Sequence, residues 1–154
     1  MKTKFLTKEQ ALIKIKHFCA YQERCHKEVR DKLISLGVKT NDRDEIIATL
    51  IEENYLNEER FAIQYAGGKF RLKQWGKNKI RHSLKGKLLS EYCIKKALKS
   101  IDDELYNETI RQLAAKKYSS LKGEQYIRKK KTIDYLLQKG YEAELVYEVM
   151  NSIV

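Results

Sequence analysis

The chain has 154 residues, of which 42% are hydrophobic and 34% carry a charge, and its net charge is +11 at pH 7. This length and hydrophobic content allow a normal folded core, and apolar positions that recur along the whole sequence argue against disorder. Because no apolar run approaches the roughly eighteen residues of a membrane span and no signal peptide is recognisable, we expect a cytoplasmic protein without membrane contact.

The residue types favour helices. Proline is absent, and most residues outside the glycines are straight-chain helix formers. The three cysteines, Cys19, Cys25 and Cys93, form no paired framework, which indicates reduced thiols in a reducing compartment. We therefore expect an all-α fold.

The first segment predicts three helices. Thr7 and Gln10 have the spacing of a capping box, which predicts a helix from there to about residue 21. A second helix is predicted for about 24–36, closed by Gly37 in a left-handed conformation. The third is expected to begin near residue 40 and to end near Asn54.

The same arrangement returns in the middle segment and again in the last. The helices of the middle segment are predicted to begin after Asn57, Gly76 and Ser90. In the helix after Gly76, apolar residues recur every four positions and predict a buried stripe of Ile80, Leu84 and Leu88. The middle helix of the last segment is expected to be closed by Gly140, as Gly37 closes its counterpart.

The three segments form an internal repeat. The matching leucines Leu33, Leu84 and Leu136 lie 51 and 52 residues apart (84 minus 33, and 136 minus 84). A period of about fifty residues that holds three short helices is typical of a repeat array. We expect repeats at 1–56, 57–101 and 102–154. Because one triplet buries its apolar face poorly, neighbouring triplets should stack into an elongated, curved molecule.

Positive charge is concentrated in the middle repeat. Between residues 69 and 99, eleven lysines and arginines accompany one carboxylate, Glu91, which leaves a net charge of +10. In the helix after Gly76, both flanks of the buried stripe are basic and neither is expected to carry a compensating acid. A solvated helix surface is the alternative, but this imbalance favours an anionic partner. The candidate binding residues are Lys69, Arg71, Lys73, Lys77, Lys79, Arg81, Lys85, Lys87, Lys95 and Lys96.

Two further features extend this candidate surface. Trp75 lies among the basic residues and either stacks on a base or packs between two helices, and the packing interpretation is favoured. A second basic patch contains a run of four cations, which must surround a helix, so solvation and phosphate contact both stay open for it. Its members are Lys116, Lys117, Arg128, Lys129, Lys130 and Lys131.

The sequence predicts neither a metal site nor a catalytic site. His17, Cys19, Cys25 and His26 are potential ligands, but their spacing is not that of structural zinc, and His17 and Cys19 point about 200° apart on a helix. No nucleophile elbow, phosphate loop, H-E-x-x-H motif or paired-carboxylate arrangement occurs. We expect no catalytic residue, no cofactor and no enzymatic activity.

The middle repeat also carries motifs of a known family. Y-L-N-E-E-R-F-A at 55–62, K-F-R at 69–71, W-G-K at 75–77 and I-R-x-x-L at 80–84 resemble the central block of the RecX family of bacterial regulatory proteins. The resemblance extends over most of the chain and includes the closures at Gly37 and Gly140. Leu88 departs from this pattern, because it stands where the outer repeats have glycine.

This resemblance implies a monomeric modulator of the RecA recombinase. Such a protein lies in the groove of the RecA–DNA filament, contacts single- and double-stranded DNA without sequence preference, and suppresses filament growth, ATP hydrolysis and strand exchange. Two alternatives stay open. One is a DNA-binding regulator with tandem helix-turn-helix units, in which Lys79, Arg81 and His82 enter a major groove. The other is a helical scaffold for an acidic peptide.

Overall fold

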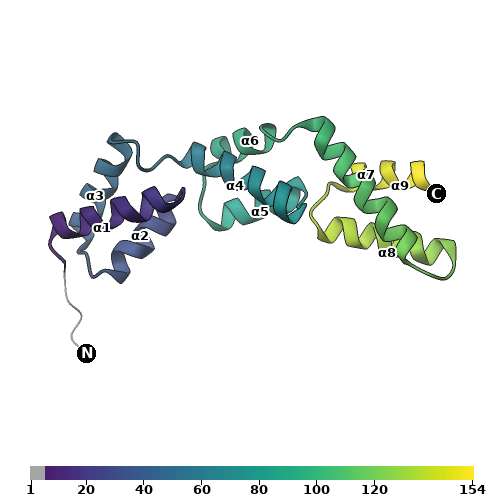
Figure 1. Ribbon diagram of the computed structural model, residues 1–154, viewed down its shortest axis with the longest axis horizontal. Helices are drawn as coiled ribbons and strands as arrows, with labels where there is room; N and C mark the ends of the chain where they lie inside the picture. Colours follow the sequence, from purple (N-terminus) through teal and green to yellow (C-terminus); the bar gives the residue numbers. More distant parts are fainter. Residues whose placement is uncertain (1–5) are drawn as a thin grey trace, which may run out of the picture.

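The computed structural model describes residues 6–154, and this part of the chain contains nine α-helices and no strand. Figure 1 shows an elongated molecule in which three groups of three helices follow one another in chain order. The predicted all-α repeat fold is confirmed. The helices are α1 Lys8–Tyr21, α2 His26–Ser35, α3 Thr40–Glu52, α4 Glu58–Lys73, α5 Lys77–Gly86, α6 Glu91–Lys99, α7 Asp103–Ser120, α8 Gln125–Gln138 and α9 Ala143–Ile153.

Side-chain caps fix several of the helix starts. At α1, the Gln10 backbone N–H donates to the Thr7 hydroxyl and the Thr7 N–H donates to the Gln10 side chain, which is the predicted capping box. Asn57, Ser90 and Asp102 cap α4, α6 and α7 by accepting a backbone N–H three residues further on. Caps of this kind contribute about 0.5–2 kcal/mol each.

The middle helix of each triplet ends in the same left-handed closure. Gly37, Leu88 and Gly140 have φ values of 77°, 64° and 101°. In each case the following residue donates its N–H to the carbonyl five positions earlier. This bond satisfies a carbonyl in the last turn that has no partner within the helix. The pairs are Val38 with Leu33, Leu89 with Leu84, and Tyr141 with Leu136. The predicted closures at Gly37 and Gly140 are therefore confirmed.

The predicted buried stripe of α5 is wrong at its last member. Leu88 is 68% exposed, whereas Leu89 is only 7% exposed and takes the buried position. The reason is that α5 ends at Gly86, so the four-residue spacing that aligns Ile80 with Leu84 no longer applies at residue 88.

We expect Leu88→Gly to stabilise the protein. A left-handed leucine costs about 1–2 kcal/mol, and the greater freedom of glycine in the unfolded chain offsets part of the relief, which leaves a gain of about 0.5–1 kcal/mol. Urea denaturation measures this change. Leu72→Gly is the matched control, because Leu72 is 84% exposed within helix α4 and its replacement should destabilise. Equal losses in the two variants would show that the exposed Leu88 side chain makes stabilising contacts.

The buried side chains form two separate cores. The first core lies within α1–α3 and includes Ile15, Leu33 and Leu50. The second core extends without interruption through α4–α9, from Phe61 to Met150. Among the described residues of the first triplet, Cys25 alone belongs to this second core.

Close backbone contact joins the second and third triplets. The Gly76 N–H donates to the Lys139 carbonyl at 2.9 Å, and the Asn78 N–H donates to the Gly140 carbonyl at 2.8 Å. A Cβ atom on Gly76 would lie 2.3 Å from the Gly140 carbonyl carbon, so only glycine fits at this position. Tyr141 adds a hydrogen bond from its hydroxyl to the Gln74 carbonyl at 2.9 Å.

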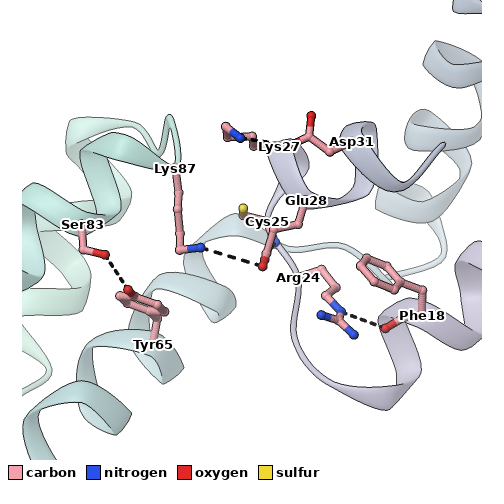
Figure 2. A network of polar contacts seen from close by, with 9 residues as sticks. All are labelled: Phe18, Arg24, Cys25, Lys27, Glu28, Asp31, Tyr65, Ser83 and Lys87. Carbon is pink, nitrogen blue, oxygen red and sulfur yellow. Dashed lines mark hydrogen bonds and ion pairs between the residues drawn. The ribbon is translucent and has the colours of Figure 1, made fainter. Parts of the chain in front are cut away.

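Polar contacts, by contrast, join the first triplet to the second. Figure 2 shows Lys87, at the end of α5, reaching the Glu28 carboxylate of α2 at 3.9 Å. Two more pairs cross the same joint, Arg60 with Glu23 and His26 with Glu58. We refer to these three pairs as the polar joint.

Cys19, Cys25 and Cys93 are buried, and none of them forms a disulfide in the described part of the chain. Burial raises the pKa of the Cys19 thiol to about 11 and also raises the pKa of Cys25, so both thiols are protonated at neutral pH.

Within residues 6–154, no three His, Cys, Asp or Glu side chains are grouped closely enough to hold a metal ion. In the same part of the chain, no helix is both long and apolar enough to cross a membrane.

Candidate nucleic-acid interface

Basic residues of the middle triplet lie on both flanks of α5. On one flank, cations alternate with aromatic rings from α4 and the α4–α5 turn. The Lys69 ammonium lies 5.4 Å from the centre of the Tyr65 ring and 5.0 Å from that of Trp75. Lys79 lies 4.8 Å from the Trp75 ring, and Lys87 lies 5.5 Å from the Tyr65 ring. We call these five residues the cation–aromatic row.

Helical spacing and one hydrogen bond hold the row together. Tyr65 and Lys69 are four apart on α4, while Lys79 and Ser83 are four apart on α5, so each pair lies on one face of its helix. The Tyr65 hydroxyl and the Ser83 hydroxyl are hydrogen-bonded, which ties the two helices together (Figure 2). Trp75 is half-buried and packs against the second core. The rings are therefore fixed, and the lysine ammonium groups lie against them.

The other flank of α5 is paired with acids. Arg81 and Lys85 both lie close to Glu91, at 3.2 and 3.4 Å, and Lys77 lies 3.7 Å from Asp103. The expectation that neither flank meets a compensating acid is thus wrong. Helices α6 and α7 bring these carboxylates beside α5, and no spacing within α5 itself could reveal them.

About half of the predicted residues have no ion pair within the described part of the chain. Lys87 pairs with Glu28 across the polar joint, and Lys96 lies 3.8 Å from Glu59. Lys69, Arg71, Lys73, Lys79 and Lys95 have no carboxylate within 4 Å among residues 6–154. We call the four of these that precede α6, namely Lys69, Arg71, Lys73 and Lys79, the unpaired set.

A cleft of about 460 Å³ opens beside the paired flank. Lys77, Arg81, Lys95 and Lys99 line it, together with Glu142. The Glu142 carboxylate accepts a hydrogen bond from Tyr106, whose hydroxyl also accepts the Lys77 backbone N–H at 2.9 Å. Burial, with Glu142 adding to it, raises the pKa of Tyr106, so the phenol stays neutral and keeps this hydrogen bond. Because the single carboxylate of the lining is hydrogen-bonded to Tyr106, the four basic side chains dominate the cleft.

Comparison with known proteins shows to which family the chain belongs. The family pattern described as "RecX, second three-helix domain" matches residues 57–98, and "RecX, third three-helix domain" matches residues 103–150. The Regulatory protein RecX of Clostridium tetani is 32% identical over 158 residues, a match that covers 98% of this chain and 72% of that protein. The chain belongs to the RecX family.

Other RecX proteins agree with this assignment. The Regulatory protein RecX of Clostridium perfringens strain 13 is 39% identical over 134 residues, which cover 85% of this chain and 60% of that relative's length. The crystal structure of RecX from Lactobacillus salivarius is similar with a TM-score of 0.85 at 26% identity, and the match covers 94% of this chain and 95% of that one. The resemblance seen in the motifs at 55–84 is therefore confirmed.

The second basic patch of this RecX chain does not form one surface. Arg128 donates to the Tyr118 carbonyl of α7 and lies 4.1 Å from the Tyr118 ring centre. Its neighbour Lys129 reaches Asn151 of α9 at 3.3 Å instead. Consecutive cations thus contact different helices, as expected for a run that surrounds α8. A role of this patch in phosphate contact stays a prediction.

Tyr65 belongs to the cation–aromatic row but was not predicted as a candidate residue from the sequence. The ten tyrosines are spread along the RecX chain, and none stands out by composition. The available signal was its spacing of four residues from Lys69 within one helix, which places a ring beside an ammonium group. The second neighbour, Lys87, is 22 residues away and could not be recognised from spacing alone.

Proposed function

We propose that this chain binds the filament that the RecA recombinase forms on DNA and limits filament growth, ATP hydrolysis and strand exchange. Modulation of this recombinase is the known role of the RecX family, to which the chain belongs. In this proposal the chain acts as a cytoplasmic monomer. Its three triplets, divided near residues 56 and 101, follow the filament groove.

The cation–aromatic row carries the proposal for DNA contact. Lys69 and Lys79 lack an acidic partner in the described structure, and their ammonium groups lie over the Trp75 ring, which is fixed by packing. Ammonium groups held in a row neutralise phosphates at little cost in side-chain order, and such contacts do not depend on base sequence. The row therefore supports DNA binding without sequence preference.

The test is RecA-dependent ATP hydrolysis on circular single-stranded DNA, with increasing amounts of this chain. We expect the wild-type chain to inhibit, and we expect Lys69→Gln/Lys79→Gln to inhibit much less because it removes two unpaired phosphate-binding groups. Lys85→Gln/Lys96→Gln is the matched control, since it removes the same charge from lysines already paired with Glu91 and Glu59. A pull-down with RecA, with and without single-stranded DNA, shows whether the filament is the target.

The alternatives give different results in these assays. A tandem helix-turn-helix regulator would give a sequence-preferring footprint on naked duplex and would leave RecA-dependent ATP hydrolysis unchanged. A scaffold for an acidic peptide would give neither a footprint nor inhibition. Either result would contradict the proposal.

A further inference from the structure

A second basic cleft lies in the first triplet, between α1 and α2. Its volume is about 430 Å³, and its lining includes Lys14, His17, Phe18, Tyr21, Arg24 and Lys32. Four of these residues come from α1 at positions 14, 17, 18 and 21, which share one helix face. This face is distinct from the buried one, which carries Ala11, Ile15 and Cys19.

The lining of this cleft contains no carboxylate. Neighbouring acids are engaged elsewhere: Asp31 pairs with Lys27 at 2.9 Å, and Glu28 and Glu23 pair across the polar joint. Within the described chain, the cations Lys14, Arg24 and Lys32 have no ion pair. The cleft is therefore positive although the triplet around it is nearly balanced in charge.

Aromatic rings form the apolar part of the cleft. The Arg24 guanidinium lies 3.7 Å from the centre of the Phe18 ring, and its Nε donates to the Phe18 carbonyl at 3.0 Å (Figure 2). The Lys32 ammonium lies 5.7 Å from the same ring. Tyr21 is 84% exposed, so its ring is open to a planar ligand.

We infer that this cleft is a binding site for single-stranded DNA, separate from the middle triplet. Single-stranded DNA supplies both chemical groups that the cleft accommodates: phosphates for Lys14, Arg24 and Lys32, and an unstacked base for the Tyr21 ring. An acidic peptide would use the cations and leave the exposed ring without a partner. Duplex DNA keeps its bases stacked and offers the ring nothing.

The test measures binding of a fluorescent oligothymidylate, without recombinase, to the full-length chain and to the same chain with its unpaired set replaced by glutamine, which removes the binding proposed for the middle triplet. In the second background Tyr21→Ala should weaken binding by roughly 5- to 150-fold, the range found when a stacking ring is removed. Because Tyr21 is 84% exposed, the fold should not change, which circular dichroism checks. Tyr147→Ala is the matched control, since Tyr147 is 51% exposed on α9 and its loss should leave binding unchanged.

Salt dependence tests the cations of the cleft. Lys14→Gln/Lys32→Gln should lower the slope of log affinity against log salt by about 1.4, at about 0.7 for each single-strand phosphate contact. Lys8→Gln/Lys27→Gln removes the same charge from lysines of the same triplet that are paired with Glu45 and Asp31, and it should leave the slope unchanged.

Three results would overturn the inference. Equal binding of oligothymidylate with and without Tyr21→Ala, in the chain whose unpaired set is replaced by glutamine, would exclude stacking. Equal slopes for the two double variants would exclude phosphate contact at this cleft. Displacement of the oligonucleotide by polyglutamate with the same potency in the wild-type and Tyr21→Ala chains would indicate a cleft for acidic peptides.

The outcome does not depend on the proposed action on RecA. The Tyr21→Ala effect is measured on DNA alone, and it should persist in a chain whose unpaired set is replaced by glutamine. Loss of the effect in that background would show that the cleft and the middle triplet form one site rather than two.

Discussion

Replacing Gly76 by alanine should lower the free energy of unfolding of the α4–α9 part by about 3–5 kcal/mol, from overpacking and lost hydrogen bonds together. The added Cβ atom would lie 2.3 Å from the Gly140 carbonyl carbon and 2.3 Å from the Tyr141 nitrogen. Both neighbours are backbone atoms, so no side-chain rotation can make room. Moving the two backbone segments apart would also break the hydrogen bonds that the Gly76 and Asn78 N–H groups donate.

Urea denaturation followed by tryptophan fluorescence measures this effect. Trp75 is the only tryptophan in the sequence and adjoins Gly76, so its emission reports on the joint between the second and third triplets. Gly86→Ala is the control, because a Cβ atom there meets nothing within 4 Å and alanine favours the end of α5. We expect this control to be slightly more stable than wild type. A Gly76→Ala protein as stable as Gly86→Ala would show that the backbone contact between the triplets is not close.

Replacing the unpaired set by glutamine should greatly weaken DNA binding and its dependence on salt. Arg71 points about 200° away from Lys69 and Lys73 on α4, so up to three of the four cations face one strand, and the slope of log affinity against log salt falls by up to about 2.1 on single strands and about 2.7 on duplex, at about 0.7 and 0.9 per contact. The reason is that every lost contact leaves one more counterion on the DNA. Fluorescence anisotropy at several salt concentrations measures the slope.

The matched control removes the same charge from the paired cations, as Lys77→Gln, Arg81→Gln, Lys85→Gln and Lys96→Gln together. All four lie within 4 Å of a carboxylate, so their positive charge is partly neutralised before DNA arrives. We expect a clearly smaller change in slope. An equal change in both quadruple variants would mean that net charge, and not the unpaired set, determines binding.

The sequence was sufficient for the elements of this fold but not for the way they meet. Local signals identified the capping box at Thr7 and the left-handed closure at Gly37, because both depend on residues only a few positions apart. Leu88 was misassigned since a leucine at a glycine position hides the end of α5. The fit of Gly76 against Gly140 joins residues 64 positions apart (140 minus 76) and leaves no trace in periodicity.

The candidate site was predictable in its charge and not in its arrangement. Counting residues located the excess positive charge in the middle triplet, but it could not show that Glu91 and Asp103 neutralise one flank of α5. These two carboxylates lie on α6 and α7, outside the helix whose charges were counted. The cleft of the first triplet was not predicted because the charges of that triplet are nearly balanced in the sequence. In the structure, the acids that balance Lys14 and Lys32 by number pair with other residues.

If the chain binds a DNA filament as proposed, the polar joint affects how long it stays bound. Because the two cores are separate, the first triplet and the remainder can each keep their fold when the other detaches. The short tether at 53–57 then holds the detached part near its former position at an effective concentration on the order of millimolar, so rebinding competes well with departure. Complete dissociation requires both parts to be off at the same moment. Individually weak contacts, each easily exchanged, thereby give a long residence time.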